Sequence, residues 1–168
     1  METLVNLITG ELGGKISGEL ICFIVSLFPI LELRGGLLAA SPALLNVPLL
    51  RAVPICIIGN LLPIPFVLLF IEKILEIMEN ISLTRGIALW LKQKAEKNRD
   101  KVMKYEFWGL VLFVGIPLPG TGAWTGSLVA ALFHMPFKKS MLACVIGVLL
   151  AAVIMSVVSY GALGLIFG

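Results

Sequence analysis

Two short polar stretches interrupt segments that are otherwise strongly apolar. The first reads ELRGG, and its Glu32 and Arg34 are the only charges between Glu19 and Arg51. Ionisable residues at membrane depth are costly and usually face a cavity, a partner or a substrate. Arg34 then offers a fork of donors suited to a phosphate or carboxylate, while Glu32 carries a coupling proton or holds Arg34 in place. In the alternative interpretation, the two charges only neutralise each other or reach water.

The second stretch reads PLPGTGAWTG. A helix that starts after Gly120 directs backbone N–H groups near Thr121, Gly122 and Ala123 into a cavity, where they can bind an anion. Thr121 and Thr125 add hydroxyl groups, and Trp124 adds a large aromatic face. The alternative is packing alone, with glycines for helix contact, threonines bonded to their own helix and Trp124 in an interface belt.

The composition excludes most soluble functions. Of the 168 residues, 59% are hydrophobic and only 14% are charged, and the mean hydropathy is +1.05, which predicts an integral membrane protein. Cys22, Cys56 and Cys144 lack metal-ligand spacing, so we interpret them as small buried hydrophobic residues and predict no metal or cofactor. Walker loops, G-x-S-x-G and H-E-x-x-H motifs do not occur, so a non-enzyme is expected.

Two apolar runs are long enough to cross a membrane. Leu49–Ile71 has twenty-three residues, which at about 1.5 Å per residue cross a core of about 30 Å, and Ser140–Phe167 is a second such run. Asn60 and the segment 63–65 interrupt the first crossing, and Asn60 is a candidate for lining the same cavity.

The apolar material before each crossing is cut in half. Ile21–Leu31 and Leu37–Leu45 flank ELRGG, and Phe107–Leu118 and Ala123–Phe133 flank PGTG. Halves of about ten to thirteen residues are too short to span a bilayer, so each pair predicts a re-entrant helical hairpin. A broken backbone at this depth survives only where protein or a water-filled cavity surrounds it. The alternative is one long kinked span for each pair.

An internal repeat accompanies this pattern. A shift of 88 positions lays segment 26–62 on segment 114–150 without a gap, with nine identities among thirty-seven positions. Four matched pairs are Pro29 and Pro117, Pro48 and Pro136, Cys56 and Cys144, and Gly59 and Gly147. A hairpin returns to its side of the membrane and a single crossing does not, so the second copy is inverted, as in many secondary transporters.

The sequence therefore predicts an all-α membrane protein with one integral membrane domain. The first repeat unit with its N-terminal lead-in is 1–71, a basic amphipathic helical loop is 72–104, and the second repeat unit is 105–168. Eight Lys and Arg residues between Lys73 and Lys104 place the loop in the cytoplasm and both termini outside. The N-terminus lacks the basic start of a signal peptide, so we expect it to be retained.

Both polar stretches resemble a known family. ELRGG at 32–36 and PLPGTGAWTG at 117–126 look like signature stretches of the small multidrug export family, over nearly the whole chain. That family is similar in predicted architecture to the DedA/VTT membrane proteins, which have two facing re-entrant loops. Several of these are implicated in moving lipid phosphates such as undecaprenyl phosphate, or lipids generally, across bilayers. The resemblance implies a prokaryotic cytoplasmic-membrane protein.

Three functions follow as hypotheses. The leading one is a small secondary transporter or flippase that binds an anionic head group between the two hairpin tips. The second is a proton-coupled exporter of cationic or amphipathic drugs, with Glu32 as the coupling group and Trp124 stacked on the substrate. The third is a non-transporting scaffold that binds partners through the basic loop.

The expected partners are membrane lipids, a small-molecule or lipid substrate and a second copy of the chain, but no nucleic acid. A monomer with two full crossings has little protein to shield its hairpins, so we predict a homodimer. Its mass in mild detergent, measured by light scattering, checks this.

Overall fold

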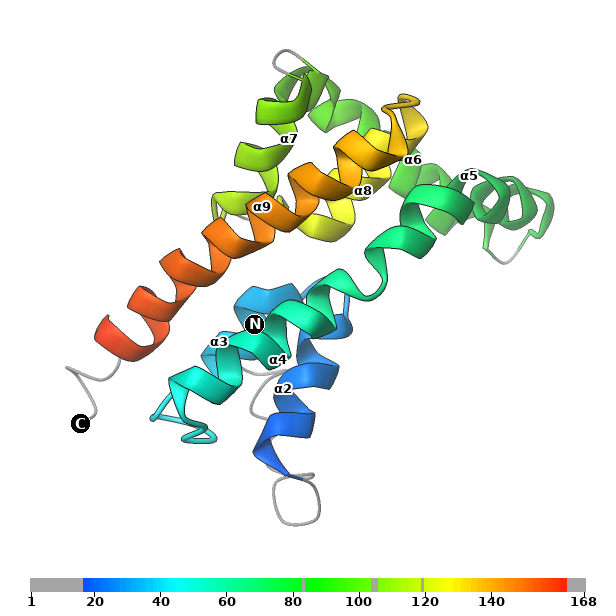
Figure 1. The fold of residues 1–168 in the computed structure, drawn as a ribbon. Helices are drawn as coiled ribbons and strands as arrows, with labels where there is room; N and C mark the ends of the chain where they lie inside the picture. The colour runs from blue at the N-terminus through cyan, green and yellow to red at the C-terminus, as the bar shows by residue number, and fades with distance from the viewer. Residues whose placement is uncertain (1–16, 83, 104–105, 119, 163–168) are drawn as a thin grey trace. The chain divides into compact units, whose positions relative to one another are not determined.

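The computed structural model describes residues 17–82, 84–103, 106–118 and 120–162, and every regular element among them is helical, as predicted (Figure 1). The α-helices are α2 (Gly18–Leu27), α3 (Glu32–Ala40), α4 (Leu49–Leu61), α5 (Ile64–Asn80), α6 (Arg85–Met103), α7 (Glu106–Gly115), α8 (Ala123–Leu132) and α9 (Phe137–Ser156). A π-helix, η1 (Val157–Ala162), continues α9. The N-terminal lead-in before position 17 lies outside the described residues.

Two helical segments are long and apolar enough to cross a membrane, judged by length and composition. They are Leu49–Ile71, with a mean hydropathy of 2.3, and Phe137–Gly161, with a mean hydropathy of 2.9. Both crossings were predicted from the sequence. The second begins at Phe137, three residues before the predicted Ser140, because the residue before it is a proline and the first turn tolerates two lysines. Its predicted end at Phe167 lies outside the described residues.

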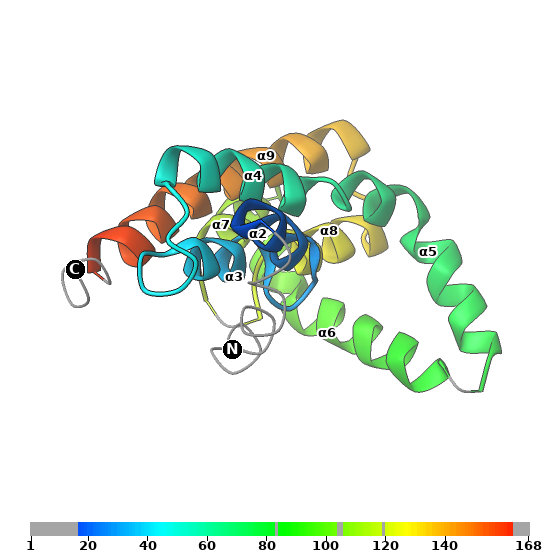
Figure 2. The ribbon, with the colours of Figure 1, turned by 90° about the horizontal axis from the view of Figure 1, so that it is seen from below.

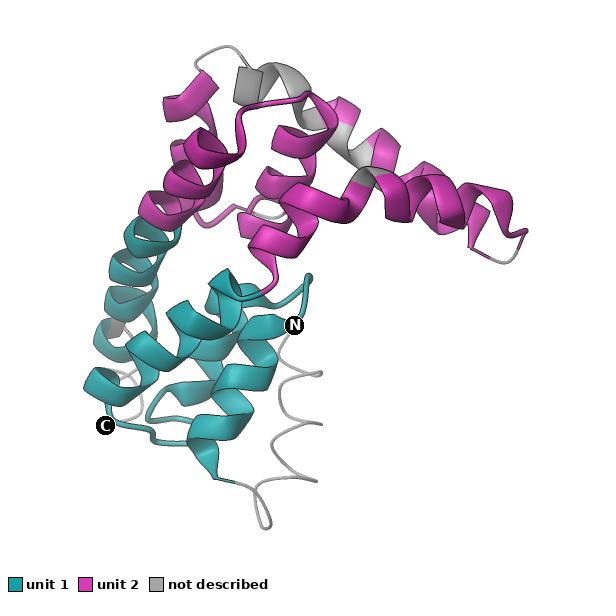
Figure 3. Ribbon diagram, turned by 45° about the vertical axis from the view of Figure 1, so that its right-hand side comes forward, with its two compact units in different colours: residues 1–62, 148–168 teal, residues 63–147 magenta. Residues whose placement is uncertain are grey.

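The chain divides into two units, which are coloured separately in Figure 3. Unit 1 is Met1–Leu62 with Val148–Gly168, and unit 2 is Pro63–Gly147. The boundaries cut both apolar segments, since α4 belongs to unit 1 and α5 to unit 2, and α9 has residues in both. Each unit therefore contains one helical hairpin, the beginning of one crossing and the end of the other.

In unit 1, α2 and α3 form an antiparallel hairpin. The chain turns at 28–31, and the Glu32 N–H donates to the Phe28 carbonyl at 2.9 Å. Gly36 packs so closely on α2 that a Cβ atom would overlap the Ser26 hydroxyl and lie 3.1 Å from the Cys22 carbonyl oxygen. ELRGG was predicted to form the tip, but it forms the first turn and a half of α3. Tertiary packing that requires glycine outweighs its low helix propensity here.

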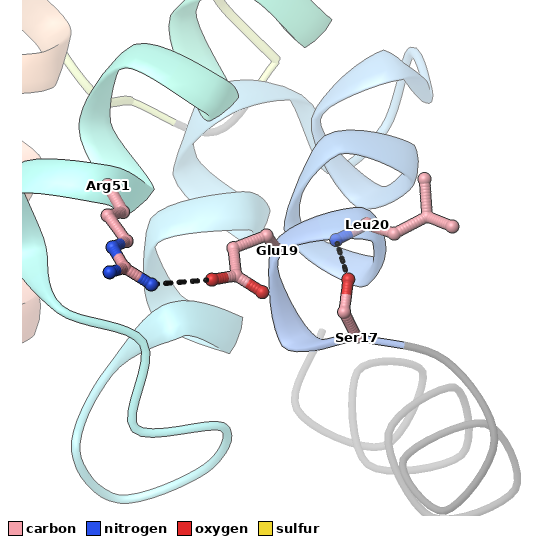
Figure 4. A network of polar contacts seen from close by, with 4 residues as sticks. All are labelled: Ser17, Glu19, Leu20 and Arg51. Atoms are coloured by element: carbon pink, nitrogen blue, oxygen red, sulfur yellow. Dashed lines mark hydrogen bonds and ion pairs between the residues drawn. The ribbon is translucent and has the colours of Figure 1, made fainter.

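The helix α4 runs beside α2 in the same direction. At the N-terminal ends of both helices, the Arg51 guanidinium lies 3.5 Å from the Glu19 carboxylate (Figure 4). The Ser17 hydroxyl caps α2 by accepting from the Leu20 N–H. Farther along, a Cβ atom on Gly59 would lie 2.7 Å from the Phe23 carbonyl oxygen. The two helices therefore touch backbone to backbone near the hairpin turn.

The end of the second crossing also belongs to unit 1. The Tyr160 hydroxyl in η1 lies 2.7 Å from the Val47 carbonyl oxygen and 3.1 Å from the Ala40 carbonyl oxygen, as its possible acceptors. These carbonyls flank the loop between α3 and α4. Tyr160 thereby joins η1 to the open end of the hairpin.

In unit 2, α7 and α8 form the second hairpin. Gly126 of α8 packs on α7, where a Cβ atom would lie 2.7 Å from the Val114 side chain and 3.0 Å from Leu110. The helix α5 packs on α8, and α6 packs on α7 and α8. Figure 2 shows α6 returning from the turn that ends α5, and a Lys92–Glu79 ion pair of 2.7 Å joins these two helices. The predicted basic loop is thus helical through α6.

The local structure of unit 1 recurs in unit 2 at the spacing of the sequence repeat. The helix α7 begins and ends 88 positions after α2 begins and ends. The helix α9 likewise begins 88 positions after α4 begins. The turn residues Asn46 and His134 share a left-handed backbone, with φ of 50° and 55°. The same helix contact joins equivalent residues in both units: Gly59 with Phe23 and Ser26, and Gly147 with Val111 and Val114. The repeat is therefore one of local packing as well as of sequence.

These contacts predict that a glycine-to-alanine substitution lowers the free energy of unfolding at Gly59 and Gly147 but not at an open position. Gly59→Ala and Gly147→Ala each place a Cβ atom under 3.0 Å from a neighbouring helix, and we expect each to lower the free energy of unfolding by about 1–3 kcal/mol. Gly86→Ala in α6 is the control, because a Cβ atom there meets nothing within 4 Å and should stabilise the helix by up to about 1 kcal/mol. Thermal unfolding in one detergent compares the three, and equal midpoints would contradict the close packing.

Candidate functional site

The first polar stretch places a buried carboxylate at the start of α3. Glu32 is 5% exposed, and it enters the helix with a φ of 51°, a left-handed conformation that is uncommon for residues other than glycine. The half-buried Arg34 follows in the same turn, and the two charges attract each other. Because a buried charge without a partner is costly, this attraction helps to keep both groups in an apolar hairpin.

Asn60 of α4 lies level with Glu32 of α3 in unit 1. Gly36 of α3 faces Cys56 of α4, with 2.8 Å between a Cβ built on the glycine and the Cys56 sulfur. These helices are antiparallel, so Glu32, one turn before Gly36, and Asn60, one turn after Cys56, lie level with each other. Asn60 is 2% exposed, and its Oδ1 atom has no hydrogen-bond partner. Glu32 and Asn60 therefore lie level with each other in unit 1, and Arg34 follows Glu32 in the same turn of α3.

The sequence analysis missed Ser26. Its side chain is fully buried, its Oγ atom has no hydrogen-bond partner, and it touches Gly36. A serine within the short apolar helix α2, four residues after Cys22, was the available signal, since these two positions lie on one helix face.

The second polar stretch forms the turn of the hairpin in unit 2. Gly120 and Gly122 have φ values of 82° and 136°, which favour glycine, and Gly122 is the N-cap of α8. The helix begins at Ala123, which confirms the predicted start of a half-helix after Gly120. Thr125 is buried in its first turn and Trp124 is half-buried beside it.

Thr121 makes hydrogen bonds within the turn between α7 and α8. Its hydroxyl lies 3.0 Å from the Ile116 carbonyl oxygen and 2.9 Å from that of Leu118, and it can donate to either. Its N–H also donates to the Leu118 carbonyl at 3.2 Å. In this conformation the hydroxyl stabilises the turn that follows α7, in agreement with the alternative in which threonines bond locally.

The candidate residues thus fall into two groups. Glu32, Arg34 and Asn60 belong to unit 1, whereas the residues from Gly120 to Thr125 belong to unit 2. Among the residues that the structure describes, no group of three or more His, Cys, Asp or Glu side chains could hold a metal ion. The three cysteines are buried and unbridged, as the sequence analysis expected.

A comparison with protein families finds one family whose model covers both polar stretches of the chain. The family model described as "Putative small multi-drug export protein" matches residues 32–154, which include Glu32, Arg34, Asn60 and the second polar stretch. The chain belongs to this family. Searches of curated proteins and of solved structures found no match. The family description is consistent with a transporter, and with the two apolar helices it indicates a membrane protein.

The hydrogen bonds of Thr121 predict a local effect. Thr121→Val removes the hydroxyl donor from the turn that follows α7 and should lower the free energy of unfolding by about 0.5–1.5 kcal/mol, whereas Thr121→Ser should retain most of this stability. Thermal unfolding of both variants in detergent measures the difference. Similar losses for serine and valine would show that the hydroxyl contributes little.

Proposed function

We propose that the chain is a small secondary transporter or flippase for molecules with an anionic head group, such as a lipid phosphate. The observation that carries this proposal is Arg34 on a short apolar hairpin, half-buried beside the buried carboxylate of Glu32. A guanidinium in such surroundings is suited to exchange its carboxylate partner for a phosphate, to which it can donate two parallel hydrogen bonds.

The proposed architecture is an inverted repeat of re-entrant hairpins. Helices α2, α3, α7 and α8 have nine or ten residues each, so each extends about 15 Å, half of the bilayer core. Each hairpin is followed by one long apolar segment, and the packing of the two copies repeats at 88 positions. A hairpin followed by one crossing inverts the second copy, which would relate the chain to the DedA/VTT membrane proteins in architecture.

We place the protein in the cytoplasmic membrane of a prokaryote, with α6 inside. Lys73, Arg85 and Lys97 are exposed in the segment that carries most of the basic residues, which supports this orientation. Accessibility of a cysteine introduced at Lys97 to a membrane-impermeant thiol reagent tests it. Labelling in intact cells would contradict it.

Arg34→Ala tests the binding role. In vesicles reconstituted with the full-length protein, the variant should move a fluorescent phosphatidic acid between leaflets at least about tenfold more slowly, because charge-assisted hydrogen bonds are lost. Arg51→Ala is the matched control in the same unit, since the Arg51 side chain is 71% exposed and pairs with Glu19 away from the turn. Unchanged transport by the folded Arg34 variant would remove the proposed role.

The family description favours a second candidate, a proton-coupled exporter of cationic drugs. Its coupling group would be Glu32, the one charged side chain among the described residues that is buried. Glu32→Gln should then abolish export of a cationic dye driven by a pH gradient, and lipid phosphates should not compete. If phosphatidic acid competes and Arg34 is required, the first function holds instead.

A further inference from the structure

The first copy of the sequence repeat has buried polar side chains where the second copy has apolar ones. At the spacing of 88 positions, Ser26 corresponds to Val114 and Asn60 corresponds to Val148, and all four side chains are buried. The equivalent glycine contacts, at Gly59 and Gly147, form in both units all the same. Packing of the hairpin against its crossing therefore does not require a serine and an asparagine, because valines serve in the other copy.

The polar positions of unit 1 hold hydrogen-bond acceptors. Asn60 Oδ1 is an acceptor only, and it is buried without a partner. Level with it lies Glu32, whose carboxylate also only accepts, and Ser26 Oγ lies unpartnered beside Gly36. An unsatisfied buried acceptor costs about 1–3 kcal/mol, so Asn60 Oδ1 and Ser26 Oγ are complementary to a ligand that supplies N–H donors.

The charges define the ligand further. Glu32 and Arg34 form a neutral pair in one turn of α3, and they attract each other. A zwitterionic ligand could give Arg34 an anion in place of Glu32 and give Glu32 a cation in place of Arg34. Both protein charges would then keep a partner of opposite sign. Its phosphate would bind the Arg34 fork, and its cation would bind the carboxylate.

We propose that Glu32 and Asn60 bind a primary ammonium group, and that the substrate is a zwitterionic amino-phosphate head group of the phosphoethanolamine class. This inference rests on the proposed function, in which Arg34 binds the phosphate. An ammonium group donates three hydrogen bonds, enough for the Glu32 carboxylate and Asn60 Oδ1 together. A quaternary ammonium carries the same charge but has no N–H donor, so it would leave Asn60 Oδ1 unsatisfied.

Stepwise N-methylation removes the N–H donors of the ammonium group one at a time while its positive charge stays. Dihexanoyl phosphatidylethanolamine, its N-methyl and N,N-dimethyl derivatives and dihexanoyl phosphatidylcholine are titrated below their micelle concentrations into the full-length protein in detergent by calorimetry. We expect affinity to fall along the series, by at least about tenfold between the first and last lipid. Dihexanoyl phosphatidylglycerol, which keeps the phosphate without a cation, should bind no better than phosphatidylcholine.

Variants assign the preference to this site. Asn60→Val reproduces the equivalent residue of the second repeat copy, and it should lower the affinity for phosphatidylethanolamine to that for phosphatidylcholine, with less than about a twofold effect on the latter. Glu32→Gln keeps the shape of the side chain and should also reduce the preference. Asn80→Val, at the exposed end of α5, is the control and should retain it. Circular dichroism confirms that the variants keep their helices.

Two results would overturn the inference. One is equal binding of phosphatidylethanolamine and phosphatidylcholine by the unmodified protein, and the other is an undiminished preference in the folded Asn60→Val and Glu32→Gln variants. Arg34→Ala distinguishes this failure from failure of the proposed function. If Arg34→Ala weakens all the phosphate lipids alike while their affinities are equal, only the ammonium site is wrong; if it weakens none, the proposed function fails.

Discussion

Direct contact between a glycine of each crossing and the backbone of the preceding hairpin is the constraint on which both units depend. Gly59 meets the Phe23 carbonyl, and Gly147 meets the Val111 carbonyl, at distances that leave no room for a side chain. In lipid, where hydrophobic attraction between helices is weak, such close approach supplies the dispersion contacts that hold helices together.

Much of the fold could be predicted because it follows from length and periodicity. The two crossings follow from long apolar runs and the start of α8 follows from a Pro/Gly turn, and both are local properties of the sequence. The first polar stretch was placed wrongly, in a turn, because Gly35 and Gly36 read as helix breakers. Their helical state depends on residues of α2 that are near in space but cannot be identified from local propensity.

Of the candidate site, only the charged residues could be identified with their role from the sequence. Glu32 and Arg34 stand out in an apolar chain, whereas Ser26 is an unremarkable small residue until its burial and lack of a partner are known. Asn60 was noted as an interruption of a crossing, and its position level with Glu32 emerged from the antiparallel register of α3 and α4. The hydroxyl of Thr121 was expected to serve a ligand, but its acceptors in the turn after α7 depend on the turn geometry at Gly120 and Gly122.

The division of the chain has a consequence for how such a protein could have arisen. The end of each crossing belongs to the unit of the other repeat, as α5 does in unit 2 and η1 does in unit 1. A half-length ancestor encoding one hairpin and one crossing would have made a unit that lacks its last helix. Two such ancestral chains would have had to exchange helix ends to complete each other, and gene fusion would then have made that exchange permanent within a single polypeptide.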